Sequence, residues 1–224
     1  MRGMSNSTFN KSIAAIGIGA MIVFIAMVMV AGIAASVIIQ TSTTLETQSL
    51  STGRETTTEV STGVAVFAIE GYAASSADIS KLAILIRPRA GTAFVDISNM
   101  FIEISNTTVK KILNYTSDYY SKPDGLNDIF SASVFPDYGG TGDATRFGIL
   151  VLEDADGSIS SSNPIINRGD KVYLCLNTTG IFNNIPERTN VWGQVIPEEG
   201  SSGLIEFKTP GTYANNVMEL YWDL

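Results

Sequence analysis

The chain of 224 residues lacks histidine and has a single cysteine. Histidine is the commonest general base and metal ligand near neutral pH, so its absence removes the usual route to acid–base catalysis. The sequence also has no G-x-S-x-G elbow and no phosphate loop ending in Lys-Ser or Lys-Thr. The Gly-rich stretch at 139–148 precedes a strand pattern and is interpreted as a loop. These absences predict a protein that is not an enzyme.

The one cysteine, Cys175, cannot form an internal disulfide. It lies in KVYLCLN, whose side chains alternate as on a strand, and we expect it to be a partly buried small hydrophobe.

Basic residues are also scarce, with 14 Lys and Arg against 22 Asp and Glu, a formal net charge of −8. An acidic chain is a poor partner for a phosphate backbone, so we expect no nucleic acid.

Charge is missing altogether between Lys11 and Glu46. The apolar part of this run, from Ile13 to Ile39, is roughly 27 residues or about 40 Å of helix, longer than the about 20 residues that span a bilayer. A cleaved secretory signal has a much shorter apolar core. Small residues recur four apart, a spacing that lets helices pack closely; they are Ala15 and Gly19, Ala31 and Ala35, and Gly32 and Ser36.

Between Gln40 and Thr62 the composition changes to Thr, Ser, Gln and Glu, without proline. Threonine is a mediocre helix former, so this part needs packing against copies of itself, with Leu45 and Val60 inward, to stay helical. A tethered binding module would instead have a flexible Pro- or Gly-Ser-rich linker. The sequence therefore favours a bundle of helices over a membrane-anchored module, which remains the alternative.

After Gly63 the period of the hydrophobic pattern becomes that of strands. Eight segments alternate in this way and are separated by Gly, Pro, Asn and Ser clusters: VAVFAIEGY, SKLAILIRP, FVDISNMFIEIS, TRFGILVLE, DKVYLCLN, NVWGQVIPE, GLIEFKTP and NVMELYWDL. The region 113–145 gives no clear pattern. Many short strands without helical patterns between them predict an antiparallel β-sandwich or barrel.

The motif DADGS, Asp154 to Ser158, offers alternate oxygen ligands followed by glycine, as at the start of a calcium loop. An EF-hand is excluded, because no Glu occupies the twelfth position. Asp154 and Asp156 are candidate ligands of a divalent cation, and a simple β-turn is the alternative. The RGD sequence at 168–170 is interpreted as a turn that opens the next strand.

Several segments resemble the archaellins, the archaeal flagellins, in the family's order. They are AIGIGAMIVFIAMVMVAGIAASVIIQTS with TGRETTTEVSTG, then ISKLAILIRPRAGTAFVDIS, FGILVLEDADGS, PIINRGDKVYL and QVIPEEG. The resemblance implies an α+β chain with a long N-terminal hydrophobic helix and an immunoglobulin-like antiparallel β-sandwich. It divides the chain into a leader at 1–14, a filament-core helix at 15–63 and an outer domain at 64–224.

What the resemblance implies for function is a structural subunit of the archaellum filament, which serves swimming motility. Its partners would be copies of itself or related archaellins, a prepilin-type signal peptidase, and the archaellum assembly platform with its ATPase. The subunit would be inserted in the membrane before assembly and extracellular afterwards. A type IV pilus-like adhesin that forms no rotating filament is the alternative.

Two kinds of modification also follow from the resemblance. The leader would be cut between Ala14 and Ala15, although Ile13-Ala14 stands where the family has a basic residue and Gly. Archaellins are commonly glycoproteins, and we expect modification of at least one of the outer-domain sequons, Asn106, Asn114 and Asn177. A bound divalent cation is the one cofactor that the family makes plausible.

Overall fold

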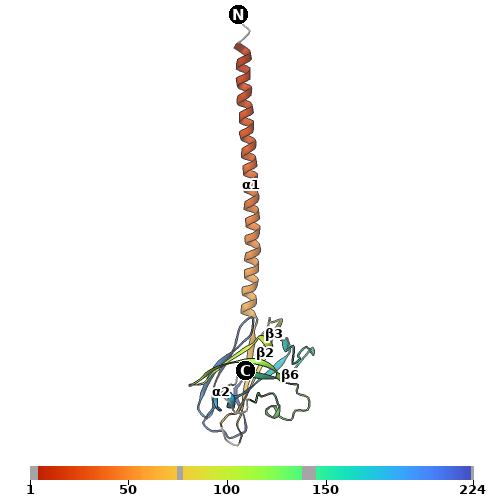
Figure 1. Cartoon of the computed structure of the whole chain (residues 1–224), viewed down its shortest axis with the longest axis vertical. Helices are drawn as coiled ribbons and strands as arrows, with labels where there is room; N and C mark the ends of the chain where they lie inside the picture. The colour runs from red at the N-terminus through yellow and green to blue at the C-terminus, as the bar shows by residue number, and fades with distance from the viewer. Residues whose placement is uncertain (1–4, 75–77, 138–144, 223–224) are drawn as a thin grey trace. The chain divides into compact units, whose positions relative to one another are not determined.

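The computed structural model describes residues 5–74, 78–137 and 145–222. They form two compact units, Met1–Glu55 and Thr56–Leu224. The first element is the helix α1, Ser5–Ser61, whose 57 residues give a length of roughly 85 Å. Figure 1 shows α1 as one unbroken helix. The helix therefore continues through the Thr-rich part, as the absence of proline predicts.

All other elements belong to the β domain. Its strands are β1 (Val64–Tyr72), β2 (Lys81–Pro88), β3 (Phe94–Asp96), β4 (Phe101–Ser105), β5 (Lys110–Ser121), β6 (Arg146–Glu153), β7 (Ile165–Asn167), β8 (Lys171–Asn177), β9 (Asn190–Ile196), β10 (Gly203–Lys208) and β11 (Val217–Trp222). Among the described residues, the short helices of the domain are η2 (Ile97–Asn99), η3 (Ile129–Ser131) and α2 (Thr178–Phe182).

Nine strands form one sheet in the order β10-β9-β4-β5-β6-β8-β2-β1-β11, and β3 pairs with β7 separately. Every pair is antiparallel except β5–β6. The sheet folds back on itself, because Val64 N donates to Ser201 O at 3.1 Å and brings the loop before β10 beside β1. The prediction of a hydrophobic helix followed by a largely antiparallel β domain is confirmed.

The core of the domain lies between the two halves of this folded sheet. Ile102 of β4 and Val195 of β9 contribute from one half, and Ile84 of β2 and Leu174 of β8 from the other, all fully buried. Every partner strand in the sheet lies within residues 64–222. The domain therefore has a complete core of its own.

A second apolar cluster covers the outer face of the central strands. Leu85 of β2 and Leu150 of β6 point away from the main core and pack against Phe130 and Phe135, which follow β5. Because both faces are covered, β2, β6 and β8 are buried at five consecutive positions each. The described part of the region 113–145, which gave no clear pattern, thus supplies this cover and most of the strand β5.

The structure corrects one strand boundary. FVDISNMFIEIS, expected as one strand, is interrupted by η2, because the Asp96 carboxylate accepts the Ser98 N–H at 2.8 Å and caps a turn. Only the ends of the segment are strands, β3 and β4.

Most of the Gly-rich stretch at 139–148 lies outside the described residues, and the same holds for residues 1–4 of the expected leader.

The junction between α1 and β1 is tied to two neighbouring loops. Gly63 has φ 129°, a conformation that favours glycine, and a Cβ there would lie 2.1 Å from Ser201 O. Its N–H donates to the buried Thr92 hydroxyl at 3.0 Å. Its carbonyl accepts the Arg89 N–H at 2.9 Å, and Thr62 O accepts the Ser201 N–H at 2.9 Å. The first strand is thus fixed at its start.

The second cluster predicts a large stability effect at Phe130, which is 3% exposed and stacks on Tyr72 and Phe135 at 5.3 and 5.6 Å. Phe130→Ala should lower the free energy of unfolding of the domain by about 3–5 kcal/mol, through lost burial and a cavity. Urea unfolding of a fragment starting at residue 56 measures this. Leu204→Ala, at a side chain 66% exposed, is the control and should cost little. Equal effects of the two changes would contradict the covering role of Phe130.

Candidate functional site

The helix α1 is apolar on every side along the run from Ile13 to Ile39. Ile22, Val23, Phe24 and Ile25 are consecutive, so at about 100° per residue they point in all directions around the axis. They are 62, 57, 68 and 49% exposed. A helix with one apolar stripe needs one partner, whereas this helix needs an apolar surrounding.

Within the described residues, nothing in the chain supplies that surrounding. A Cβ added at Gly17, Gly19 or Gly32 would have no atom within 4 Å apart from the adjoining backbone of α1 itself. By length and composition α1 also contains a stretch apolar enough to cross a membrane. The small residues Ala31, Ala35 and Ser36 are likewise exposed. The structure therefore leaves the predicted packing positions open for contacts outside this chain.

Several threonines in the polar half of α1 satisfy their hydroxyl groups within the helix. The hydroxyls of Thr41, Thr43 and Thr44 donate to carbonyls four residues earlier, at 2.7 to 2.9 Å. Thr47 donates to the carbonyl three residues earlier at 2.8 Å. A threonine bonded in this way presents mainly its methyl group and requires no water. This part of the helix is therefore compatible with burial among other helices, although its composition is polar.

The DADGS segment forms a loop after β6 that the aspartates hold in shape. Asp154 Oδ1 accepts the N–H groups of Gly157 and Ser158 at 2.8 and 3.1 Å. Asp156 accepts the Ser158 N–H at 3.0 Å and an Asn167 side-chain N–H at 2.6 Å. Hydrogen bonds from Ser158 and then Asn167 hold the pKa of Asp156 below its usual value, so this carboxylate stays ionised.

A third carboxylate, Asp170, meets these two, and sequence reasoning missed it. Asp170 was part of the RGD turn, and that turn is present, since Asp170 N donates to Asn167 O just before β8. Its buried carboxylate accepts the Ala155 and Asn167 N–H groups at 2.9 and 2.8 Å. The signal that could have found it is weak, an acid directly before a strand whose five central positions are buried.

The three carboxylates fit a divalent cation. One oxygen from each of Asp154, Asp156 and Asp170 lies within 4.8 Å of the others. A carboxylate oxygen that accepts one N–H keeps a second lone pair for a metal. Three like charges at this separation repel unless a cation is between them, and Lys122 Nζ is 3.8 Å from Asp154. Oxygen-only ligands favour a hard ion such as Ca²⁺, which would bind through Asp154, Asp156 and Asp170 and hold the β6 and β8 ends together.

The three outer-domain sequons differ in their surroundings. Asn114 is exposed in the middle of β5, opposite Phe101. Asn106 lies in the β4–β5 turn, where its side-chain oxygen accepts the Thr108 and Val109 N–H groups. Asn177 caps α2 through its oxygen and donates its amide N–H to Pro136 O at 2.8 Å. A glycan on the Asn177 nitrogen would have to compete with that bond.

Cys175, Tyr173 and Glu70 are ionisable groups that lie partly or wholly inside the domain. Cys175 is fully buried, as a small hydrophobe, and burial raises the pKa of its thiol, the opposite of an activated nucleophile. The Tyr173 hydroxyl donates to Glu70 at 3.0 Å and joins β8 to β1 across the intervening β2. Burial is the main cause that raises the pKa of both groups.

These features define a class of protein. A helix that is apolar on every side continues into a β domain with its own core, so the chain is a subunit whose helix must be buried by lipid or by other chains.

Comparisons with known proteins agree with this class. The archaeal-type flagellin family model matches residues 14–207. Flagellin B3 of Methanocaldococcus jannaschii is 41% identical over 208 residues, covering 92% of this chain and 94% of the relative. Flagellin B3 of Thermococcus kodakarensis is 38% identical over 255 residues, covering 95% and 99%. The chain belongs to the archaeal-type flagellin family, as the sequence resemblance predicted.

Solved structures support the same assignment. The crystal structure of archaeal flagellin FlaB1 from Methanocaldococcus jannaschii has a TM-score of 0.61 at 34% identity, covering 71% of this chain and 96% of that chain. The archaeal flagellum of Methanospirillum hungatei has a TM-score of 0.60 at 14% identity, covering 90% and 98%. The second match shows that the fold is shared along nearly the whole chain.

The acidic loop predicts that Ca²⁺ stabilises the domain. Removing divalent cations with a chelator should lower the melting temperature of the 56–224 fragment, since a ligand at about 100 times its Kd contributes about 2.7 kcal/mol. Asp154→Asn removes the charge but keeps an oxygen for the Gly157 N–H, so its melting temperature should not respond to chelator. Asp124→Asn, at an exposed acid elsewhere, is the control and should respond like wild type. If the wild-type melting temperature ignores both chelator and Ca²⁺, the loop is a turn only.

Proposed function

We propose that this archaeal flagellin is the structural subunit of an extracellular filament and polymerises through α1. The observation that carries this is the helix itself, apolar on every side and uncovered within the described chain. Burying one aliphatic side chain completely contributes about 1.5–3 kcal/mol, so many exposed Ile, Val and Met side chains drive association strongly. Helices of many copies packed around one axis provide cover on all sides.

The same property supports a membrane-inserted precursor. The apolar part of α1 is long enough to cross a bilayer. Lipid and a helix bundle are both apolar, so transfer from one to the other does not expose the helix to water. A prepilin-type signal peptidase would release the chain between Ala14 and Ala15, and an assembly platform with its ATPase would move it into the filament.

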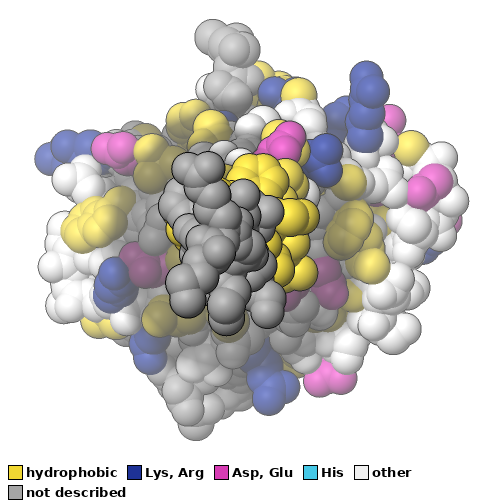
Figure 2. Space-filling model, turned by 90° about the horizontal axis from the view of Figure 1, so that it is seen from above, with side chains coloured by type: hydrophobic (Ala, Val, Ile, Leu, Met, Phe, Trp, Pro, Cys, Tyr) yellow, Lys and Arg dark blue, Asp and Glu magenta, His cyan; other side chains and the backbone are white. Residues whose placement is uncertain are grey.

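The β domain would form the exterior of the filament. Figure 2 shows basic, acidic and other polar side chains interspersed with scattered hydrophobic ones in this view, so charge of both signs is spread over the exposed surface. A cation held by Asp154, Asp156 and Asp170 would stiffen this exterior. Glycans would be carried by Asn106 and Asn114, and least readily by Asn177, whose amide N–H is bonded in the folded domain.

The alternative is a membrane-anchored binding module that forms no filament. Its helix would need to end near the lipid and give way to a flexible linker. The helix instead continues to Ser61, and the hydroxyls of Thr41, Thr43 and Thr44 in its polar half are bonded within it. These two observations favour polymerisation.

Close packing at Gly32 gives a test that separates the two functions. Gly32→Leu should leave membrane insertion intact, because it raises hydrophobicity. In a bundle the added side chain forces helices apart, at about 1–3 kcal/mol per subunit, so surface filaments should be lost or much shorter. Ile33→Leu, which conserves volume on the next residue, is the control and should assemble. Membrane-fraction protein is measured by immunoblot and filaments by electron microscopy; normal filaments of Gly32→Leu would argue against tight packing there.

Processing and glycosylation are checked on one peptide map of sheared filaments. We expect a mature N-terminus at Ala15, two residues inside the apolar run that begins at Ile13. We also expect added glycan mass on the peptides of Asn106 or Asn114. A filament peptide that begins before Ile13 or after Gly19 would refute the cleavage position, and unmodified Asn106 and Asn114 peptides would refute the glycosylation.

A further inference from the structure

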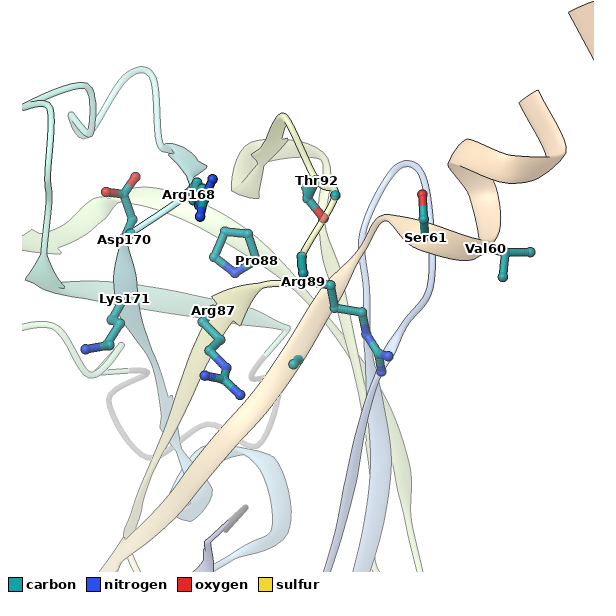
Figure 3. A pocket seen from close by; sticks show the side chains of 13 residues that line it. Val60, Ser61, Arg87, Pro88, Arg89, Thr92, Arg168, Asp170 and Lys171 are labelled. Carbon is teal, nitrogen blue, oxygen red and sulfur yellow. The ribbon is translucent and has the colours of Figure 1, made fainter. Parts of the chain in front are cut away.

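A basic pocket lies beside the last turn of α1. Its cavity of about 970 Å³ is bounded by Val60 and Ser61 on one side. The end of β2 and the turn after it supply Arg87 and Arg89 (Figure 3). The turn before β8 supplies the rest of its charged lining, namely Arg168, Asp170 and Lys171. We call this cavity, whose basic lining residues are Arg87, Arg89, Arg168 and Lys171, the basic pocket.

The positive charge of this pocket is concentrated for so acidic a chain. Of the 14 Lys and Arg residues, Arg2 and Lys11 precede the expected cut, which leaves 12, and four of these line one cavity. The acid among its lining residues, Asp170, is 1% exposed and its oxygens already accept two backbone N–H groups. The pocket therefore presents a net positive charge on a chain of net charge −8.

Internal contacts engage these side chains unequally. Lys171 pairs with Glu153 at 2.8 Å, and Arg89 Nε donates to Val64 O at 3.2 Å. Arg87 lies over the Phe67 ring at 5.0 Å, a contact that leaves its N–H groups free to donate. Arg87 and Arg168 are both exposed. A guanidinium group binds a carboxylate through two parallel hydrogen bonds, so these two arginines suit an acidic partner.

The end of α1 carries the complementary charge. Glu55 and Glu59 are four residues apart, exposed, and on the same face of the helix, where like charges repel. Both precede the negative end of the helix dipole, and no basic residue occupies the last turn. Packing copies of α1 side by side would add further repulsion between these carboxylates. Arg54 adjoins Glu55, and a basic surface on a neighbouring copy would relieve the remaining repulsion at Glu55 and Glu59.

We propose that the basic pocket of one copy binds the Glu55–Glu59 face of α1 in a neighbouring copy. The inference rests on the proposed function. Helices that pack side by side have axes about 8–10 Å apart, and the pocket opens directly beside the last turn of α1, through Val60 and Ser61. Each subunit then offers both halves of the contact, and the head-to-tail contact repeats along an open polymer. Electrostatic complementarity of this kind fixes the register between subunits.

A charge exchange in the full-length chain tests the contact. The first variant carries Arg87→Glu and Arg168→Glu, the second Glu55→Lys and Glu59→Lys, and the third all four changes. The first two should each lower the filament yield of cells at least about tenfold, a difference of about 1.4 kcal/mol. The third should restore most of the yield, because the opposite charges face each other again. Lys208→Glu, an exposed charge at the far end of β10, is the matched control and should assemble like wild type.

The outcomes separate this contact from the proposed function. If wild type itself forms no filaments, the proposed function fails. If wild type assembles and the first variant does too, or if the third variant is no better than the first, the contact between copies is wrong. The second of these results would mean that the pocket binds another anion.

Folding is controlled independently. Melting of the 56–224 fragment with Arg87→Glu and Arg168→Glu must match wild type, and membrane-fraction protein must be unchanged. If that fragment is destabilised, Arg87→Gln with Arg168→Gln replaces it. The Gln pair should reduce filament yield less than the Glu pair and should make assembly less sensitive to salt. Unchanged yield and salt sensitivity in the Gln pair would overturn the proposal.

Discussion

The exclusion of water from α1 is the constraint on which the rest of the structure depends. Its first half is apolar on all sides, so no single interface covers it. Lipid satisfies this requirement for one copy, and only a many-sided bundle satisfies it for a polymer. The β domain, in contrast, buries its own core and makes no such demand. The chain therefore divides its tasks, with the helix supplying cohesion and the domain supplying a surface for water.

The polar half of α1 shows how composition and environment can differ. Threonines outnumber apolar residues after Gln40, yet their hydroxyls bond to the carbonyls of the preceding turn. Such a surface is neither strongly attractive nor costly to dehydrate. It allows the helix to leave the apolar zone without a break. Specific contacts in this half then depend on the few charges, among which Glu55 and Glu59 share one face.

The sequence was sufficient for the helix and for most strands, because periodicity reports which faces are buried. VAVFAIEGY corresponds to β1 over its whole length. It was insufficient where tertiary contacts decide. Strand β5 pairs in parallel with β6, and Phe130 and Phe135 cover an outer sheet face, neither of which leaves a local pattern. At the acidic loop, the DADGS motif predicted Asp154 and Asp156 as candidate ligands, whereas only the fold brings Asp170 next to them. The basic pocket likewise combines residues from two distant turns.

The junction at Gly63 has a mechanical consequence. Residues 62–64 are bonded to Thr92, Arg89 and Ser201, and the strand that follows lies between β2 and β11. A force along β1 would therefore act in shear on the hydrogen bonds of both its edges at the same time. These bonds would have to break together and not one after another. In a filament of such subunits, a force that reaches the end of α1 would therefore be shared by many hydrogen bonds of the domain in parallel. Contacts between subunits would then give way under load before the attachment of each domain to its helix.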